Sequence, residues 1–316
     1  MNRTGITWSR IGNVIPVLFG ISVVSFLLIR IVPGDPVQQI LGNRYTDATG
    51  DQLRQSLGLN DSLLGQYGHF MSSVFQGKFG VSYQYKRDVG ALIAERMLPS
   101  LLLVLLTGIL CVLISLPLGI SAAVRRGGVL DQGTRMFFTL GYALPSFLLG
   151  VLLIYIFGLK LSWFPIGGYG SGLADHLYHL IMPAVTLAIP FSTVLVRSLR
   201  ASAVDVLESD FVTTARLKGI SPGAVVRRHV LRSALSSVVV VFGINLAFLV
   251  GGTVVIENVF SIPGLGGLLV GSVDTRDYPV VQAVAFVLAV FVVLVNLLTD
   301  AVHGLLDPRV AAVTAG

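Results

Sequence analysis

The residues with the most distinctive chemistry lie in a polar, basic stretch from Asp210 to Leu235, which interrupts an otherwise apolar chain. Helix caps, small residues and cations dominate it, and these residue types suit recognition rather than bond making. Asp210 is placed to cap a helix over Phe211–Lys218, and Gly219 supplies the left-handed backbone that often follows a helix. Ser221 is placed to cap a second helix that begins with proline. The stretch therefore predicts two short helices in tandem.

The first of these helices and the chain before it carry apolar residues at helical spacing. Val204, Leu207, Phe211 and Ala215 recur every three or four positions, so we expect them on one face. An apolar face in a polar loop fits two situations. The helix could lie on lipid headgroups, or it could dock into a groove of a partner protein, and the stretch alone leaves both open.

The sequence contains no recognisable motif for catalysis or nucleotide hydrolysis. It has no HExxH metal motif, no GxSxG nucleophile elbow and no pair of acids in the middle of an apolar segment. Its one Gly-Lys pair, Gly77-Lys78, is followed by Phe79 rather than by the Ser or Thr of a phosphate-binding loop. We therefore expect no catalytic residue, no metal site and no ATP site in this chain.

The elements that must position the polar stretch are apolar. Of the 316 residues, 54% are hydrophobic and only 12% are charged, against roughly 25% charged in a typical globular protein. This composition predicts an all-α polytopic membrane protein. Six segments are long and apolar enough to cross a hydrocarbon core about 30 Å thick. They are Ile11–Val32, Leu98–Val124, Met136–Leu159, Leu177–Val196, Leu235–Ile256 and Pro279–His303.

Basic residues set the predicted orientation. With the N-terminus inside, the inner segments hold thirteen of the 22 Lys and Arg residues but only six of the 16 acids. Because basic residues near span ends favour the cytosolic side, both termini and the Asp210–Leu235 stretch are expected in the cytosol, and Arg125-Arg126 is interpreted as part of this orientation signal. Ionisable residues in the spans lie near span ends, which argues against a carrier driven by a proton or sodium gradient. They are Arg30, Glu257, Asp300 and His303.

Three regions follow from these spans. Residues 1–32 are the cytosolic N-terminus and first span, residues 33–98 are a small extracytoplasmic domain, and residues 99–316 are a five-helix membrane core containing the cytosolic segment 205–235. Asp35 lies in a Pro-Gly-Asp-Pro turn, where we expect it to hold backbone amides. Asn245 and Asn296 are polar residues within spans, and we favour hydrogen bonds between helices over a role in lining a pathway.

The polar stretch belongs to an ordered set of motifs that covers nearly the whole chain. In chain order the set comprises Ile15-Pro16, Pro33-Gly34-Asp35-Pro36, Gly58-Leu59, Gln66-Tyr67, Gly141–Ser146, Phe211, Thr214, Ala215, Lys218, Gly219, His229, Leu231, Arg232, Ala234, Glu257–Gly266, Arg276–Pro279, Asn296–Asp300 and Asp307–Arg309. This set resembles the inner-membrane permease subunits of bacterial ABC importers of the dipeptide, oligopeptide and nickel class.

Three residues depart from the pattern of that class. Thr213 stands where the general cytosolic signature has an acid, Ser233 where the peptide subgroup usually has Asn, and Ser237 where it often has Pro. Because a proline would mark a kink, its replacement leaves the start of the fifth span less well defined.

The resemblance implies a type I ABC permease fold with six transmembrane helices in the bacterial inner membrane. It implies a second homologous permease, two cytosolic ABC ATPases that bind ATP and Mg, and an extracytoplasmic solute-binding protein as partners. The chain itself would bind membrane lipid but no cofactor and no nucleic acid. Its function would be to form a pathway for peptides by alternating access. Nickel chelates, haem or another small solute are the alternative cargoes, and an ion-driven carrier is a lower-ranked alternative.

The resemblance also implies roles for individual residues. Residues expected to couple the chain to the ATPases are Asp210, Phe211, Thr214, Ala215, Lys218, Gly219, His229 and Arg232. Residues expected to contact the binding protein are Asp35, Arg276 and Asp277. Asn245 and Asn296 are the candidates for lining the pathway.

Overall fold

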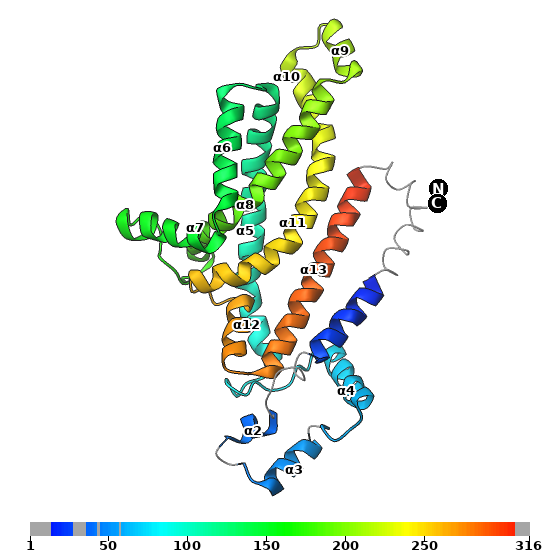
Figure 1. Ribbon diagram of the computed structural model, residues 1–316, viewed down its shortest axis with the longest axis vertical. Coiled ribbons are helices and arrows are strands. Elements are labelled where there is room, and N and C mark those ends of the chain that lie inside the picture. Colours follow the sequence, from blue (N-terminus) through cyan, green and yellow to red (C-terminus); the bar gives the residue numbers. More distant parts are fainter. Residues whose placement is uncertain (1–13, 28–35, 43–44, 57, 307–316) are drawn as a thin grey trace. The chain divides into compact units, whose positions relative to one another are not determined.

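A computed structural model describes residues 14–27, 36–42, 45–56 and 58–306 (Figure 1). These residues form helices and contain no strand, apart from one isolated antiparallel bridge between Val81 and Asp88. The all-α prediction is therefore confirmed. The elements are Val14–Leu27, α2 (Pro36–Leu41), α3 (Asp47–Ser56), α4 (Leu63–Phe75), α5 (Val89–Val124), α6 (Val129–Ala143), α7 (Ser146–Leu153), η2 (Ile154–Lys160), α8 (Leu173–Leu207), α9 (Asp210–Leu217), α10 (Pro222–Val225), η3 (Val226–Val230), α11 (Leu231–Val259), α12 (Leu265–Asp274) and α13 (Tyr278–Leu306).

Four of the described helices are long and apolar enough to cross a membrane. They lie in α5, α8, α11 and α13, at the second, fourth, fifth and sixth predicted spans. Three shorter apolar helices, Val14–Leu27, Ser146–Lys160 and Leu265–Asp274, accompany them. The chain is thus polytopic as expected, while the count of six spans stays a prediction.

The third predicted span is not one continuous helix. Helix α6 ends at Ala143, Leu144 has an extended backbone with ψ of 129°, and Pro145 precedes α7. The physical reason is local, because the ring of a proline disfavours helical backbone in the residue before it. Figure 1 shows α7 running across the direction of α6. The prediction of one segment from Met136 to Leu159 was wrong at this point.

Two helices extend beyond the spans predicted for them. Helix α5 begins at Val89 rather than near Leu98, and it contains Pro99 and Pro117. Helix α8 runs on to Leu207, so the eleven residues after Val196 continue the helix instead of forming a loop. The polar stretch therefore follows the end of a helix of 35 residues.

The described residues fall into two compact units. Unit 1 contains residues 99–263 and 292–306, and unit 2 contains residues 14–27, 36–42, 45–56, 58–98 and 264–291. In unit 1, α8 packs against α11, α6 and α7, and its buried side shares a core with α5. Glycines allow helices of this unit to approach closely. A Cβ at Gly119 would lie 2.7 Å from Leu199, and one at Gly243 would lie 1.8 Å from Thr299.

Unit 2 has its own apolar core, formed by the start of α5, helix α12 and the start of α13. Its fully or nearly fully buried members are Val89, Leu92, Ile93, Leu265, Leu268, Val280, Ala283 and Val284. In the same unit the helix Val14–Leu27 packs on α4, where Ser22 and Tyr67 share a hydrogen bond of 2.6 Å and Phe26 contacts the Tyr67 ring. The predicted division at residues 33–98 did not include residues 264–291, which pack in this unit.

Candidate functional site

The polar stretch begins with a break between α8 and α9. Ser209, with φ of −74° and ψ of 150°, is the N-cap residue of α9, and its hydroxyl donates to the Val206 carbonyl at 2.5 Å. Asp210 is therefore the first residue of the helix and not its cap, contrary to the prediction. A carboxylate in the first turn still interacts favourably with the partial positive charge of the helix N-terminus.

The end of α9 follows the predicted pattern. Lys218 is the C-cap residue, and Gly219 follows with φ of +79°, a left-handed backbone that side chains with a Cβ rarely adopt. The Ile220 amide donates to the Ala215 carbonyl at 3.1 Å and closes the turn. Ser221 occupies the N-cap position of α10, without a capping hydrogen bond from its side chain, and the helix begins at Pro222 as predicted. Helix α10 has only four residues and continues through η3 into α11.

One side of α9 packs inside the chain. Val212 and Ala215 are buried against Val225 of α10, with Val206 and Ile220 beside them. Val204 and Leu207 pack elsewhere, around the buried residues Ala123, Ala203 and Val230. The predicted single face through Val204, Leu207, Phe211 and Ala215 is therefore wrong, because the break at Ser209 ends the helical register of α8 before α9 begins.

The other side of α9 faces outward. Phe211 is 51% exposed and Leu217 is 85% exposed, although both are large apolar residues. Thr213, Thr214, Lys218 and Gly219 are also exposed. Leu217, which lies six residues after Phe211 and three after Thr214, was not among the predicted coupling residues. We call Phe211, Thr213, Thr214, Leu217 and Lys218 the outer face of α9.

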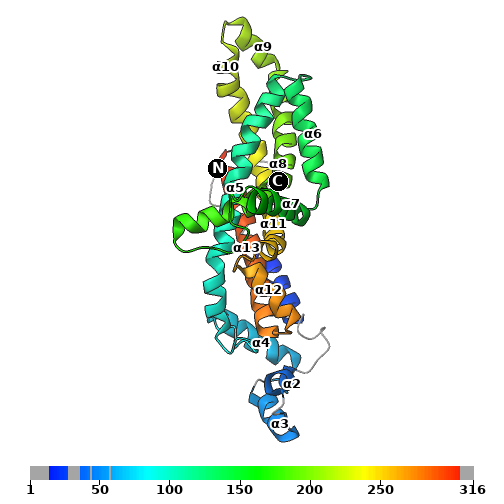
Figure 2. The same cartoon turned by 90° about the vertical axis from the view of Figure 1, so that its left-hand side faces the viewer.

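The other predicted coupling residues are placed as follows. Asp210 is exposed, and Ala215 belongs to the buried side of α9. The backbones of His229 and Arg232 lie in η3 and at the start of α11, but their side chains lie outside what the structure describes. Figures 1 and 2 show α9 and α10 at the same end of unit 1 as the turn between α5 and α6.

A buried carboxylate at this end of unit 1 was not recognised in the sequence. Asp131, on the first turn of α6, accepts hydrogen bonds from Arg200 Nε at 2.7 Å and Nη2 at 2.9 Å. It also accepts from Arg135 Nη2 and the Gly127 amide, each at 3.0 Å. The bonds from Arg200, helped by those from Gly127 and Arg135, hold the pKa of Asp131 well below its usual range despite burial.

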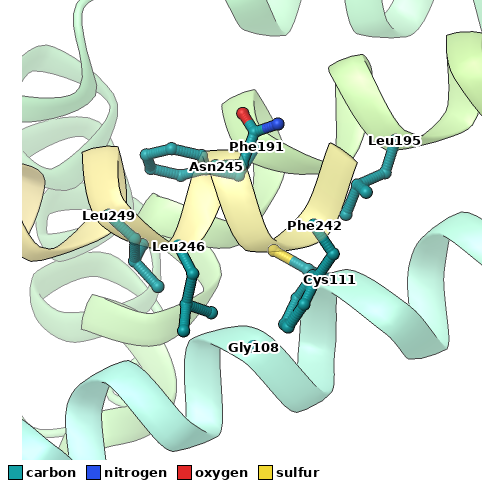
Figure 3. Close-up of a pocket in the computed structure, with 8 residues that line it drawn as sticks. All are labelled: Gly108, Cys111, Phe191, Leu195, Phe242, Asn245, Leu246 and Leu249. Carbon is teal, nitrogen blue, oxygen red and sulfur yellow. The ribbon is translucent and has the colours of Figure 1, made fainter. Parts of the chain in front are cut away.

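The two candidates for lining a pathway differ in position. Asn245 lines a small pocket of about 10 Å³ formed by α5, α8 and α11, whereas Asn296 is exposed on α13. Figure 3 shows the lining residues, which are Gly108, Cys111, Phe191, Leu195, Phe242, Asn245, Leu246 and Leu249. The Asn245 amide donates to the Val241 carbonyl of its own helix at 2.6 Å. The predicted bond between helices is thus not made by this amide nitrogen.

The candidates for contacting a binding protein are also placed differently from one another. Asp35 lies outside the described residues. Arg276 is exposed with φ of +54°, but Asp277 is fully buried. Its carboxylate accepts from the Ser82 hydroxyl at 2.5 Å and from the amides of Tyr83 and Gln84 at 3.0 and 3.1 Å. Asp277 therefore holds the loop before α5, and burial together with Asp277 raises the pKa of Tyr83 to about 12.

The described residues contain no arrangement suited to a metal. No group of three or more His, Cys, Asp or Glu side chains among them is placed to hold an ion.

Comparison with known proteins points to one family. Residues 115–312 match the family described as binding-protein-dependent transport system inner membrane component. Residues 6–104 match a second family, described as the N-terminal part of binding-protein-dependent transport system membrane components.

Curated relatives match over nearly the full length of both chains. A probable peptide ABC transporter permease protein, y4tP of Sinorhizobium fredii, is 38% identical over 304 residues, which is 95% of this chain and 97% of that protein. The glutathione transport system permease protein GsiC of Escherichia coli K12 is 40% identical over 301 residues, with the same two coverages.

A solved structure shares the fold. An inward-facing conformation of the MetNI methionine ABC transporter matches with a TM-score of 0.59 at 20% identity, covering 68% of this chain and 96% of that chain. The predicted type I permease architecture is thereby supported at the level of fold.

Proposed function

This chain belongs to the family of binding-protein-dependent transport system inner membrane components, and we propose that it forms, with a second homologous permease, the pathway of a peptide importer. Members of this family are membrane components, and ATP is hydrolysed by separate subunits. We propose two such ATPases as partners on the cytosolic side, and a solute-binding protein on the opposite side that delivers the solute. The membrane is the bacterial inner membrane, with both chain termini in the cytosol.

Peptides are the proposed cargo. The relatives that match over almost the whole chain are named for peptide and glutathione transport, and glutathione is itself a small peptide. The described part of the chain also offers no metal-binding group that would favour a metal chelate.

The observation that carries the proposed coupling is the outer face of α9. Two large apolar side chains, Phe211 and Leu217, are exposed on a short helix whose other exposed residues are polar or charged. Such exposure is unfavourable unless a partner covers it, since burying one of these side chains contributes roughly 1.5–3 kcal/mol. We propose that the outer face docks into a cleft of the ATPase. Ala215 and Gly219 then act indirectly, by packing α9 and by shaping its end.

A reconstituted complex tests this function. The purified permeases, ATPases and binding protein in proteoliposomes should take up radiolabelled glutathione or dialanine only when ATP is present on the cytosolic side. This chain reconstituted alone should take up neither. Uptake by the chain alone, driven by a proton or sodium gradient, would overturn the proposal in favour of a secondary carrier.

A single substitution tests the docking face. Leu217→Asp removes about 2 kcal/mol of apolar contact, which corresponds to about 30-fold weaker ATPase binding. The matched control is Leu64→Asp in α4, because Leu64 is 84% exposed and lies in the region predicted outside the cytosol. Copurification of the ATPases should fall for the first variant and stay unchanged for the second. Equal retention of the ATPases by both variants would contradict docking through this face.

A further inference from the structure

The cluster around Asp131 joins parts of the chain that are far apart in sequence. Asp131 and Arg135 lie on α6, Gly127 lies in the turn before it, and Arg200 lies near the cytosolic end of α8, 69 residues from Asp131. Arg200 presents two nitrogen atoms to the two carboxylate oxygens, the forked geometry that fixes both distance and angle. The carboxylate is buried, so solvent screens these bonds only weakly.

A second ion pair ties the same turn to the end of α8, just before the break that precedes α9. Arg126, in the same turn as Gly127, pairs with Glu208, the C-cap residue of α8. Glu208 is followed directly by Ser209, which caps α9. Beside these charges, Ala123 of α5, Ala203 of α8 and Val230 of η3 form a buried apolar contact. The α5–α6 turn is therefore fastened to the end of α8 and to η3 by packing as well as by charge.

A role in setting the membrane orientation of the chain does not by itself explain this arrangement. An arginine that only orients a span needs to be basic and near the cytosolic face, and Arg125 and Arg126 already satisfy that requirement. Burying Asp131 between two arginines is costly unless every partner is in place, because a missing partner leaves an uncompensated charge. The fork from Arg200, with the bonds from Arg135 and Gly127, therefore holds α6 against the end of α8.

We propose that Asp131, Arg200 and Arg135 are positioning residues that make the α5–α6 turn, α6 and the end of α8 move with α9 as one block. The inference rests on the proposed docking of α9 to an ATPase. Without the cluster, a displacement that α9 passes to the end of α8 would move α8 relative to α6. With it, the displacement reaches α6 as well as α8, and ATP hydrolysis is coupled to movement of the pathway helices.

A distance measurement tests the block directly. In a Cys111→Ala chain, which has no other cysteine, spin labels are placed at Val129→Cys on α6 and Arg216→Cys on α9. Val129 is 89% exposed, and Arg216 is also exposed and is not one of the residues that define the outer face of α9. The complex is then measured without nucleotide and with ATP and vanadate. We expect the distance distribution to be the same in both states. A nucleotide-dependent shift in this chain would overturn the proposal, whatever the variants show.

Two variants then test the role of the charges. Asp131→Asn removes the charge at constant size, and Arg200→Lys keeps the charge but loses the fork. With either variant, the distribution of distances between the two spin labels should broaden and should change with nucleotide. Uptake of labelled dialanine should fall about tenfold or more while ATP hydrolysis continues. A purely structural role would lower the yield of the complex without changing uptake per ATP. Glu95→Gln, which breaks an exposed ion pair with Arg87, should change neither quantity.

A crosslink separates this proposal from the function on which it rests. Leu217→Cys should form a crosslink with the ATPase if α9 docks. Failure of this crosslink overturns the docking itself. A crosslink that forms while the Val129–Arg216 distance changes with nucleotide leaves docking intact and overturns only the block. If Asp131→Asn cannot be purified, the block is still tested by the Arg200→Lys variant and by the labelled chain that keeps both Asp131 and Arg200.

Discussion

Gly219 offers the sharpest test of how α9 is shaped, because its environment isolates one physical effect. Its φ is +79°, and a Cβ added there would meet no atom within 4 Å. Substitution therefore causes no clash and disturbs no packing. What remains is the intrinsic cost of left-handed backbone, about 1–2 kcal/mol for a residue with a Cβ. Gly219→Ala should thus shift the local equilibrium of the α9–α10 corner about 5- to 30-fold toward open forms.

Limited trypsin digestion measures that equilibrium at the corner itself, because Arg216 and Lys218 are exposed there. The cleavage rate after Lys218 should rise by about the same factor in Gly219→Ala, and ATP-dependent uptake should fall. Gly219→Asn should behave nearly like the parent, since Asn tolerates this backbone better than most residues. The matched control is Gly223→Ala, because Gly223 also has open space around it but lies in α10 with no positive φ. Equal cleavage of the Gly219→Ala and Gly223→Ala chains would refute the reasoning.

Three further predictions follow from other contacts. Asp277→Asn weakens three hydrogen bonds to the loop before α5, each worth about 1.5–3 kcal/mol when charged, so protease cleavage of that loop should accelerate. Because the folded pKa of Asp131 is depressed, its stabilisation is complete above the unfolded value of about 3.9 and is lost as pH falls through the folded pKa, so the melting temperature in detergent should not change with pH because of this group between pH 5 and 8. Gly243→Ala places a methyl group on Thr299 and should cost about 1–3 kcal/mol by thermal unfolding, and Thr299→Gly should recover part of it.

Local features of the polar stretch were predictable because they depend on neighbouring residues. Gly219 ends α9 in the expected backbone, and Ser221 with Pro222 begins the next helix. The break at Pro145 could also have been predicted, since the residue before a proline avoids helical backbone. These rules act over one turn of chain, which is the range that a single sequence displays directly.

Features that depend on pairing across the fold were not predictable in the same way. The sequence shows Asp131 as an acid in a predicted loop, and only the fold brings Arg200 to its carboxylate. In the same way, the bond between Asp277 and Ser82 joins residues that are 195 positions apart in the chain. The face of α9 was misjudged for a related reason. Spacing by three and four residues is meaningful only inside one helix, and the chain changes direction at Ser209.

The shortness of α9 explains why its attachments matter more than its own helical stability. Eight residues are too few to form a stable helix alone, so its orientation must come from its joints. Ser209 ties it to α8 through the chain, while Val212 and Ala215 pack on Val225, which lies on the run that continues into α11. A force on α9 therefore reaches α8 by covalent connection and α11 by packing. Enlarging Ala215, as in Ala215→Phe, would separate α9 from Val225 and should disconnect α11 while leaving the path to α8 intact.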